Sequence, residues 1–171
     1  RGGRADASRD GGGGSSGRAA GRLGYGLNGQ VVAGRGQGLG MTMLGFDPYS
    51  GAERCRGLGV HKAQTSDEVY AEADCITIHL PKTPETEGWL DAEAFAKMKD
   101  GVRVLNVARG PLIVDEDLQA ALDSGKVGGA ALDVFRSEPI TDHPLFSYPQ
   151  VIVTPHLGAS TAEATDRAGF Q

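Results

Sequence analysis

Short apolar runs alternate with segments of helical periodicity along most of this chain, from Leu23 to its end. Continuous runs of branched and apolar residues are typical of parallel strands that are covered on both faces. Such runs predict strands over residues 41–46, 75–79, 102–107, 129–134 and 151–154.

The segments between these runs carry the end signals of helices. Ser66 precedes "DEVYAEA" and Asp91 precedes "AEAFAKM" as predicted N-caps, while "DEDLQAALDSG" opens with acidic residues and closes on Gly125. Each predicted helix lies between two predicted strands, so the chain reads as repeated βαβ units. Right-handed crossovers then give an α/β fold, a Rossmann-type doubly wound parallel sheet with helices on both faces.

The first 22 residues differ in composition from the rest of the chain. Residues 1–22 are almost entirely Gly, Arg, Ala, Ser and Asp, without apolar periodicity, so they cannot bury enough surface to offset the entropy of ordering. We therefore predict a disordered or artefactual head over 1–22 and one cofactor-binding domain over 23–171. Because the chain starts at Arg1 and its last segment, "TAEATDRAGFQ", reads as an interrupted helix, we interpret it as a fragment.

Composition narrows the classes of function. The net charge of -5 argues against nucleic acid or a membrane surface as a partner, because such surfaces call for a basic excess. No apolar run approaches the roughly 18 residues of a membrane span. Cys55 and Cys75 lack metal-ligand spacing and suggest free thiols in a reducing compartment. We expect no metal, no membrane association and a cytoplasmic location.

The stretch "GYGLNG" is a candidate phosphate-binding turn, with Gly24, Gly26 and Gly29 in the GxGxxG pattern. The pattern is weak alone, because a chain with 27 glycines can produce it by chance. Asp47 follows the strand predicted at 41–46 at the spacing expected for a carboxylate that holds the adenosine ribose, although it could equally begin a turn before Pro48. A carboxylate there favours NAD over NADP.

The residues around this turn support the pattern poorly. We expect the crossover helix within "QVVAGRGQGLG", after Gly29, but three further glycines each weaken a helix by roughly 1 kcal/mol relative to Ala. Upstream, "GRAAGRLGYG" is a poor first strand. A phosphate-binding turn and a glycine-rich loop therefore both remain open from spacing alone.

Four later motifs occur in a fixed order: "HLPKTPETEGWL", "VRVLNVARGPLIVDEDLQAAL", "AALDVFRSEP" and "VIVTPHLGASTAEA". In that order they resemble the nucleotide-binding domain of the D-isomer-specific 2-hydroxyacid dehydrogenases. Members of that family usually have a second, substrate-binding domain, which this chain lacks. The form "PHLGAST" is most similar to the branch that acts on a phosphorylated 2-hydroxyacid.

The resemblance implies roles for three catalytic residues. Arg109 would hold the substrate carboxylate, and His156 would exchange a proton with the substrate hydroxyl. Glu138 would pair with that histidine and favour its protonated form. Histidines 61, 79 and 143 fit no motif, and we expect them to be structural or exposed. The residues expected to bind the cofactor are Gly24, Gly26, Leu27, Asn28, Gly29, Asp47, Leu80, Val107, Ala108, Asp133, His156 and Gly158.

The expected function is hydride transfer between NAD and a small D-2-hydroxyacid or its 2-oxoacid, by a domain that commonly forms homodimers or higher homo-oligomers. Two alternatives stay open. The same fold could serve as a non-catalytic module that senses dinucleotide and recruits a protein, or the chain could be an inactive fragment without an ordered cofactor site.

Overall fold

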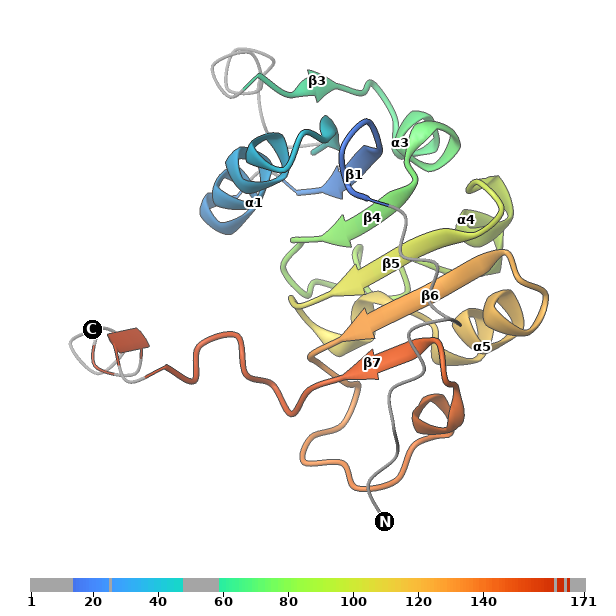
Figure 1. The fold of residues 1–171 in the computed structure, drawn as a ribbon. Helices are drawn as coiled ribbons and strands as arrows, with labels where there is room; N and C mark the ends of the chain where they lie inside the picture. The colour runs from blue at the N-terminus through green and yellow to red at the C-terminus, as the bar shows by residue number, and fades with distance from the viewer. Residues whose placement is uncertain (1–13, 25, 48–58, 162, 165, 167–171) are drawn as a thin grey trace.

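The computed structural model describes residues 14–24, 26–47, 59–161, 163–164 and 166 of the 171-residue chain. Seven parallel strands form one sheet in the order β3-β2-β1-β4-β5-β6-β7 (Figure 1). The chain reverses its direction of travel across the sheet at β1, as in doubly wound dinucleotide-binding folds. The strands are β1 (Ala19–Leu23), β2 (Thr42–Phe46), β3 (His61–Lys62), β4 (Cys75–Ile78), β5 (Val102–Asn106), β6 (Val127–Leu132) and β7 (Val151–Val153).

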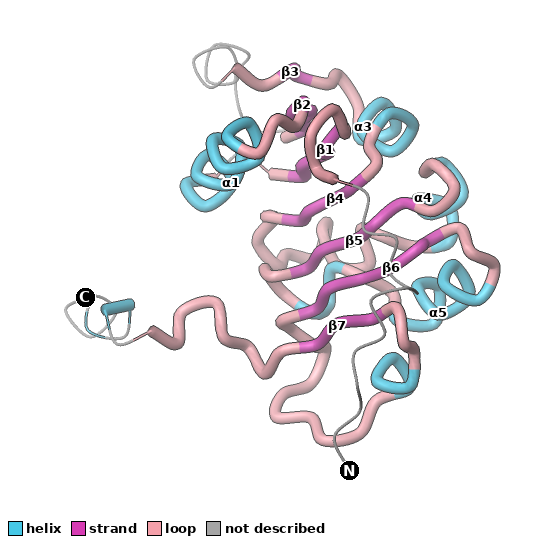
Figure 2. Tube along the Cα trace, in the orientation of Figure 1, coloured by secondary structure: helices cyan, strands magenta, loops and turns pink. Residues whose placement is uncertain are grey.

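Helices cover both faces of the sheet (Figure 2). Helix α1 (Leu27–Gly38) packs Ala33 against Ala20 and Met43 on one face. The other face carries a larger apolar cluster, to which α3, α4 and α5 all contribute buried side chains. This arrangement confirms the predicted α/β class. The remaining helices are α3 (Ser66–Glu72), α4 (Ala92–Lys97), α5 (Asp115–Asp123) and the 3-10 turns η1 (Gly110–Leu112) and η2 (Pro144–Ser147).

Two of the three predicted helix-end signals are confirmed. Asp91 caps α4 by accepting a hydrogen bond from the backbone N of Ala94 at 2.9 Å, and Gly125 follows α5 with a φ of 76°. The prediction for α3 is wrong by one residue. Thr65, in extended conformation, accepts from the backbone N of Glu68, so Ser66 is already the first helical residue. Adjacent Thr and Ser are both good caps, so residue type alone does not place the helix start, and here it is Thr65 that has the extended backbone of an N-cap.

The predicted boundary between a disordered head and the domain at residue 23 is wrong. Strand β1 begins at Ala19, pairs with β2 on one side and β4 on the other, and so lies inside the sheet. Gly21 makes this possible, because a Cβ there would lie 2.5 Å from Cγ1 of Val69 on α3. Pairing on both edges overrides the weak strand propensity of "AAGRL". Residues 1–13 of the predicted head lie outside the described residues.

Helix α1 begins earlier than predicted, at Leu27 instead of after Gly29, and ends at Gly38. Its glycines fit the packing at one point, since a Cβ on Gly36 would lie 2.4 Å from Sδ of Met43 on β2. The helix therefore starts within the GxGxxG stretch and approaches the sheet closely. In the part of the chain that is described, no helix is both long enough and apolar enough to cross a membrane.

Candidate cofactor and active site

The turn after β1 requires glycine at two positions. Gly24 has a φ of 100°, and a Cβ there would lie 2.5 Å from the carbonyl oxygen of His79 at the end of β4. A Cβ on Gly29 would lie 2.7 Å from the carbonyl oxygen of Gly24. Side chains are thus excluded from both sides of the turn, so its geometry requires glycine at these two positions.

The N-terminus of α1 opens directly from this turn. Gly26 is its N-cap and supplies no side-chain hydrogen bond, and the first turn contains no acidic residue. Backbone amides at such a helix end carry partial positive charge and can bind a phosphate. The cradle therefore fits the pyrophosphate of a dinucleotide, with Leu27 and Asn28 as the first residues of the helix.

A cavity of about 480 Å³ lies where the loops after β4 and β5 face the start of α1. It collects four residues predicted to bind the cofactor, Asn28, Leu80, Val107 and Ala108, and Arg109 also lines it. Their convergence at the carboxyl ends of parallel strands is the usual ligand position in open α/β sheets. His79, Pro81 and Lys82 complete the lining.

Asp47 lies at the end of β2, as predicted, with 8% of its surface exposed. It does not line the cavity of 480 Å³, and the segment from Pro48 lies outside the described residues. Its place, one strand beyond the turn, is the side on which the adenosine end of a dinucleotide would extend.

Arg109 is held by a buried asparagine at the end of β5. The side-chain amide of Asn106 donates to the carbonyl oxygen of Arg109 at 2.9 Å, and its Oδ1 accepts from the backbone N of Ala108 at 3.1 Å. Asn106 is 1% exposed, so these bonds fix the path of the loop. The exposed guanidinium of Arg109 is left at the rim of the site.

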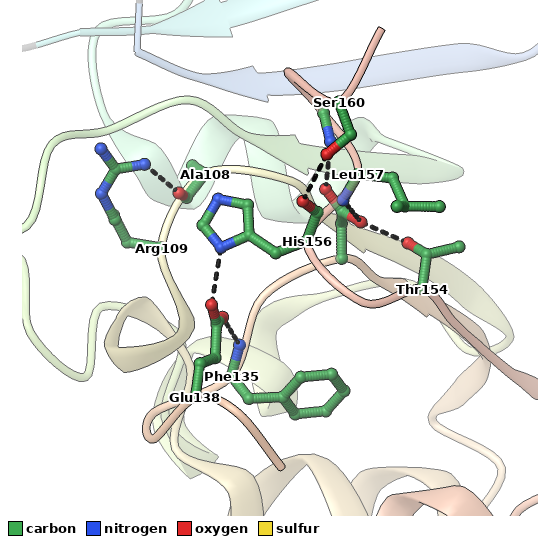
Figure 3. Close-up of polar contacts among 10 residues, drawn as sticks. Ala108, Arg109, Phe135, Glu138, Thr154, His156, Leu157 and Ser160 are labelled. Carbon is green, nitrogen blue, oxygen red and sulfur yellow. Dashed lines mark hydrogen bonds and ion pairs between the residues drawn. The ribbon is translucent and has the colours of Figure 1, made fainter. Parts of the chain in front are cut away.

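His156 and Glu138 form a short pair. Nδ1 of His156 lies 2.6 Å from Oε2 of Glu138, and Oε1 of Glu138 accepts from the backbone N of Phe135 at 2.8 Å. The hydrogen bond with His156, followed by that from Phe135, lowers the pKa of Glu138 below its ordinary value. The carboxylate is therefore ionised at neutral pH, and Nε2 of the imidazole points away from it (Figure 3).

Asp133 anchors the loop that carries His156. Its Oδ1 accepts from Thr154 and from the backbone N of Leu157 at 2.7 Å, and its Oδ2 accepts from the backbone N of Gly158 at 2.9 Å. Burial alone would raise the pKa of Asp133, but these hydrogen bonds outweigh it and lower the pKa. The tether holds His156 with a φ of 55°, in the left-handed region.

A second cavity, of about 240 Å³, brings the three predicted catalytic residues together. Arg109, Glu138 and His156 all line it, with Lys82 and Arg136 beside them. An adjacent cavity of about 460 Å³ is mainly apolar and shares His156 and Glu138. Asp133 and Gly158 line neither of these cavities: Asp133 is buried beneath the loop, and Gly158 is an exposed residue of the loop itself.

The sequence interpretation missed several residues that shape the site. Asn106 was assigned no role from the sequence, although a polar residue at the end of an apolar strand is a signal that could have indicated one. His79 was expected to be structural or exposed, yet it lines the large cavity and accepts or donates a hydrogen bond with Thr77 at 3.0 Å. Burial, together with the charge of Arg22, lowers the pKa of His79 to about 4. His143 is structural, as expected, and pairs with Asp115 at 3.3 Å.

Comparison of the sequence with known protein families agrees with this geometry. The sequence model of the D-isomer specific 2-hydroxyacid dehydrogenase NAD-binding domain matches residues 2–158. The chain belongs to this family. The matched domain is the one that binds NAD, and its site at the carboxyl ends of β1, β4 and β5 has the glycine cradle that a dinucleotide requires.

Named relatives are identical to the chain at about half of the aligned positions. D-3-phosphoglycerate dehydrogenase of Mycobacterium leprae is 51% identical over 153 residues, which cover 90% of this chain and 29% of that protein. The enzyme of the same name from Bacillus subtilis is 49% identical over 148 residues, covering 86% and 28%. The chain thus spans less than a third of the length of these relatives.

Solved structures of the family show the same fold. D-mandelate dehydrogenase of Rhodotorula graminis superposes with a TM-score of 0.87 at 32% identity, covering 92% of this chain and 46% of that protein. D-lactate dehydrogenase of Escherichia coli gives a TM-score of 0.81 at 35% identity, covering 88% and 47%. This chain thus matches about half of the length of each of these neighbours.

Proposed function

We propose that this chain is the catalytic and cofactor-binding part of an NAD-dependent D-2-hydroxyacid dehydrogenase whose substrate is 3-phosphoglycerate, the entry to serine biosynthesis. The observation that carries the proposal is the pair of His156 and Glu138, 2.6 Å apart, across a shared cavity from Arg109. Oxidation of a 2-hydroxyacid needs a proton acceptor and a cation for the carboxylate, and these residues supply both.

His156 exchanges the proton of the substrate hydroxyl through Nε2. Its Nδ1 is taken by the Glu138 carboxylate, which fixes the orientation of the ring and stabilises the imidazolium that forms when the proton arrives. Because Glu138 is itself held by the backbone N of Phe135, the pair keeps its geometry in the absence of substrate.

Arg109 orients the substrate. Its planar guanidinium can hold the carboxylate by two parallel hydrogen bonds and so turn the hydroxyl toward His156. It lines both the cavity that contains His156 and the one that faces α1, so it stands between the substrate position and the cofactor position. Bound NAD would supply the hydride acceptor in the cavity that faces α1.

The cofactor contacts follow from the same geometry. The turn at residues 24–29 would hold the pyrophosphate, and Asp47 would accept both ribose hydroxyls and disfavour NADP. Leu80, Val107 and Ala108 would contact the nicotinamide half. Asp133 and Gly158 contribute by fixing the loop of His156.

The choice of 3-phosphoglycerate is supported by the names of the relatives near 50% identity and by "PHLGAST". Lys82 adds positive charge beside the catalytic cavity, where Arg136 is already paired with Glu87, and this charge suits a substrate with a second anionic group. We also propose a cytoplasmic homodimer, and the exposed apolar side chains of Phe146 on η2, Ile152 on β7 and Leu157 after β7 support an interface at this edge of the sheet. Light scattering on the purified chain checks the dimer.

The testing experiment is titration of the 171-residue chain with NADH, followed by a turnover assay with 3-phosphoglycerate and NAD on a longer protein that adds a substrate-binding domain to this chain. We expect saturable one-to-one binding and a turnover that His156→Gln lowers by about 10²-fold or more while NADH affinity stays unchanged. Binding without turnover would favour the dinucleotide-sensing module, and absence of binding by a folded chain would favour the inactive fragment.

A further inference from the structure

Arg22 is a fully buried cation beneath the cofactor turn. It lies on β1 with 0% of its surface exposed, and by strand alternation it shares a face with Ala20, which packs toward α1. A Cβ on Gly29 would lie 3.0 Å from Nη1 of Arg22. The guanidinium is therefore packed against the first turn of α1, on the side away from solvent.

The charges around the start of α1 are unlike those at the other helices of the described chain. Helices α3 and α4 have side-chain caps and acidic residues in their first turns, and α5 has three acidic residues there. The first turn of α1 has neither a side-chain cap nor an acidic residue. The buried guanidinium of Arg22 and the positive end of α1 therefore lie side by side, and an anion bound above them is attracted by both.

The cavity of about 480 Å³ that faces the start of α1 is also lined by positive charge. Lys82 and Arg109 line it, and the described lining residues include no carboxylate, although the chain as a whole carries a net charge of -5. His79 adds no charge near neutral pH, because its pKa is lowered to about 4 by burial and by Arg22. Arg22 is thus a fixed charge at the base of a cationic site.

We propose that Arg22 is a positioning residue for the cofactor, setting the affinity for the pyrophosphate through its buried charge without touching the ligand. This inference rests on the proposed assignment of residues 24–29 as the phosphate cradle. It predicts that ligands with a pyrophosphate depend on Arg22, whereas a ligand with only the base and ribose does not.

A competing explanation is that Arg22 acts on cofactor binding through Asp47. Arg22 pairs in register with Gly45, so Asp47, two residues further along, points to the same face of the sheet. If Arg22 acted through Asp47, its removal would change binding of the ribose hydroxyls, and adenosine would be affected as strongly as a dinucleotide.

The experiment titrates the 171-residue chain and its variants with ADP-ribose and with adenosine. Replacing the guanidinium by an unbranched apolar side chain, Arg22→Met, is expected to weaken ADP-ribose about ten-fold, since one charge acting through the protein interior is lost. Adenosine affinity is expected to stay unchanged. Equal losses for both ligands, or no loss for either, would overturn the inference.

Arg22→Lys is the matched variant and decides the question if the Met variant does not fold, as checked by circular dichroism. Burial lowers the pKa of a lysine, so its charge can be removed by raising the pH, whereas arginine keeps its charge. ADP-ribose affinity of the Lys variant should fall with rising pH while that of the wild type stays flat. Identical pH profiles would contradict the proposal. A wild-type chain that binds no ADP-ribose would remove the cradle assignment and this inference together, independently of any turnover.

Discussion

Two loops at the same edge of the sheet are held in opposite ways. The turn after β1 is shaped by the absence of side chains at Gly24 and Gly29, whereas the loop after β7 is tied down by the carboxylates of Asp133 and Glu138. The turn after β1 leaves backbone amides that can bind an anion. In the loop after β7, the polar groups hold one imidazole in place. A cradle and a catalytic side chain thus require different kinds of local order.

The two regions also differ in the core beneath them. The cluster under α1 joins Ala20, Ala33, Met43 and Val60, with Met41 at its edge. The cluster under α3, α4 and α5 joins 24 buried residues. Because apolar burial is the main source of stability, we expect the α1 side to be the first to open. The following changes test that contrast, in order of falling effect.

Deleting residues 1–22 should have the largest effect. The deletion removes four of the five residues of β1 and leaves β2 and β4 without the partner between them. We expect loss of the cooperative thermal transition, followed by circular dichroism. A shortened chain that melts like the wild type would mean that this central strand is dispensable.

Gly24→Ala and Gly34→Ala should change the free energy of unfolding in opposite directions. At Gly24 the φ of 100° and the close approach of His79 make a side chain cost roughly 2–3 kcal/mol of unfolding free energy and abolish NADH binding. At Gly34, where no described atom beyond the neighbouring helix backbone lies within 4 Å of the added Cβ, alanine should stabilise α1 by up to about 1 kcal/mol. Urea denaturation measures both. Equal destabilisation by the two would argue against the cradle geometry.

Asn106→Ala should loosen the loop of Arg109. The substitution leaves the backbone N of Ala108 and the carbonyl oxygen of Arg109 without their partner, at a cost of about 1–2 kcal/mol. In the turnover assay we expect a higher KM for the 2-hydroxyacid with NADH affinity retained. An unchanged KM would show that the loop keeps its path without the asparagine.

His79→Asn should have little effect at neutral pH and a visible one in acid. In the wild type, His79 of the unfolded chain takes up a proton near pH 6.5, whereas His79 of the folded chain takes one up only near pH 4. The free energy of unfolding therefore falls as the pH drops from about 6.5 to about 4. The variant removes this contribution, so its stability should fall less steeply there. Urea midpoints at several pH values measure the slope, and parallel curves would contradict the low pKa.

The candidate catalytic residues could be named from the sequence because their signals are local. "NVARG", "RSEP" and "PHLGAS" contain Arg109, Glu138 and His156, and the structure places these three residues around one cavity, while their catalytic roles stay predictions. The β1 region was predicted poorly, since "AAGRL" carries neither strand propensity nor apolar alternation. Its place inside the sheet depends on β2 and β4, which lie far along the chain.

By itself, the sequence determined the alternation of strands and helices, the α/β class and the order of the motifs that identify the family. Those features follow from periodicity and from short runs of residues. The tertiary structure alone decided that Ala19–Leu23 is an inner strand, that Arg22 is buried under the turn, and that Asn106 and Asp133 hold the two loops of the site. Each of these depends on groups that only the folded sheet brings together, and whose burial overrides what their local sequence prefers.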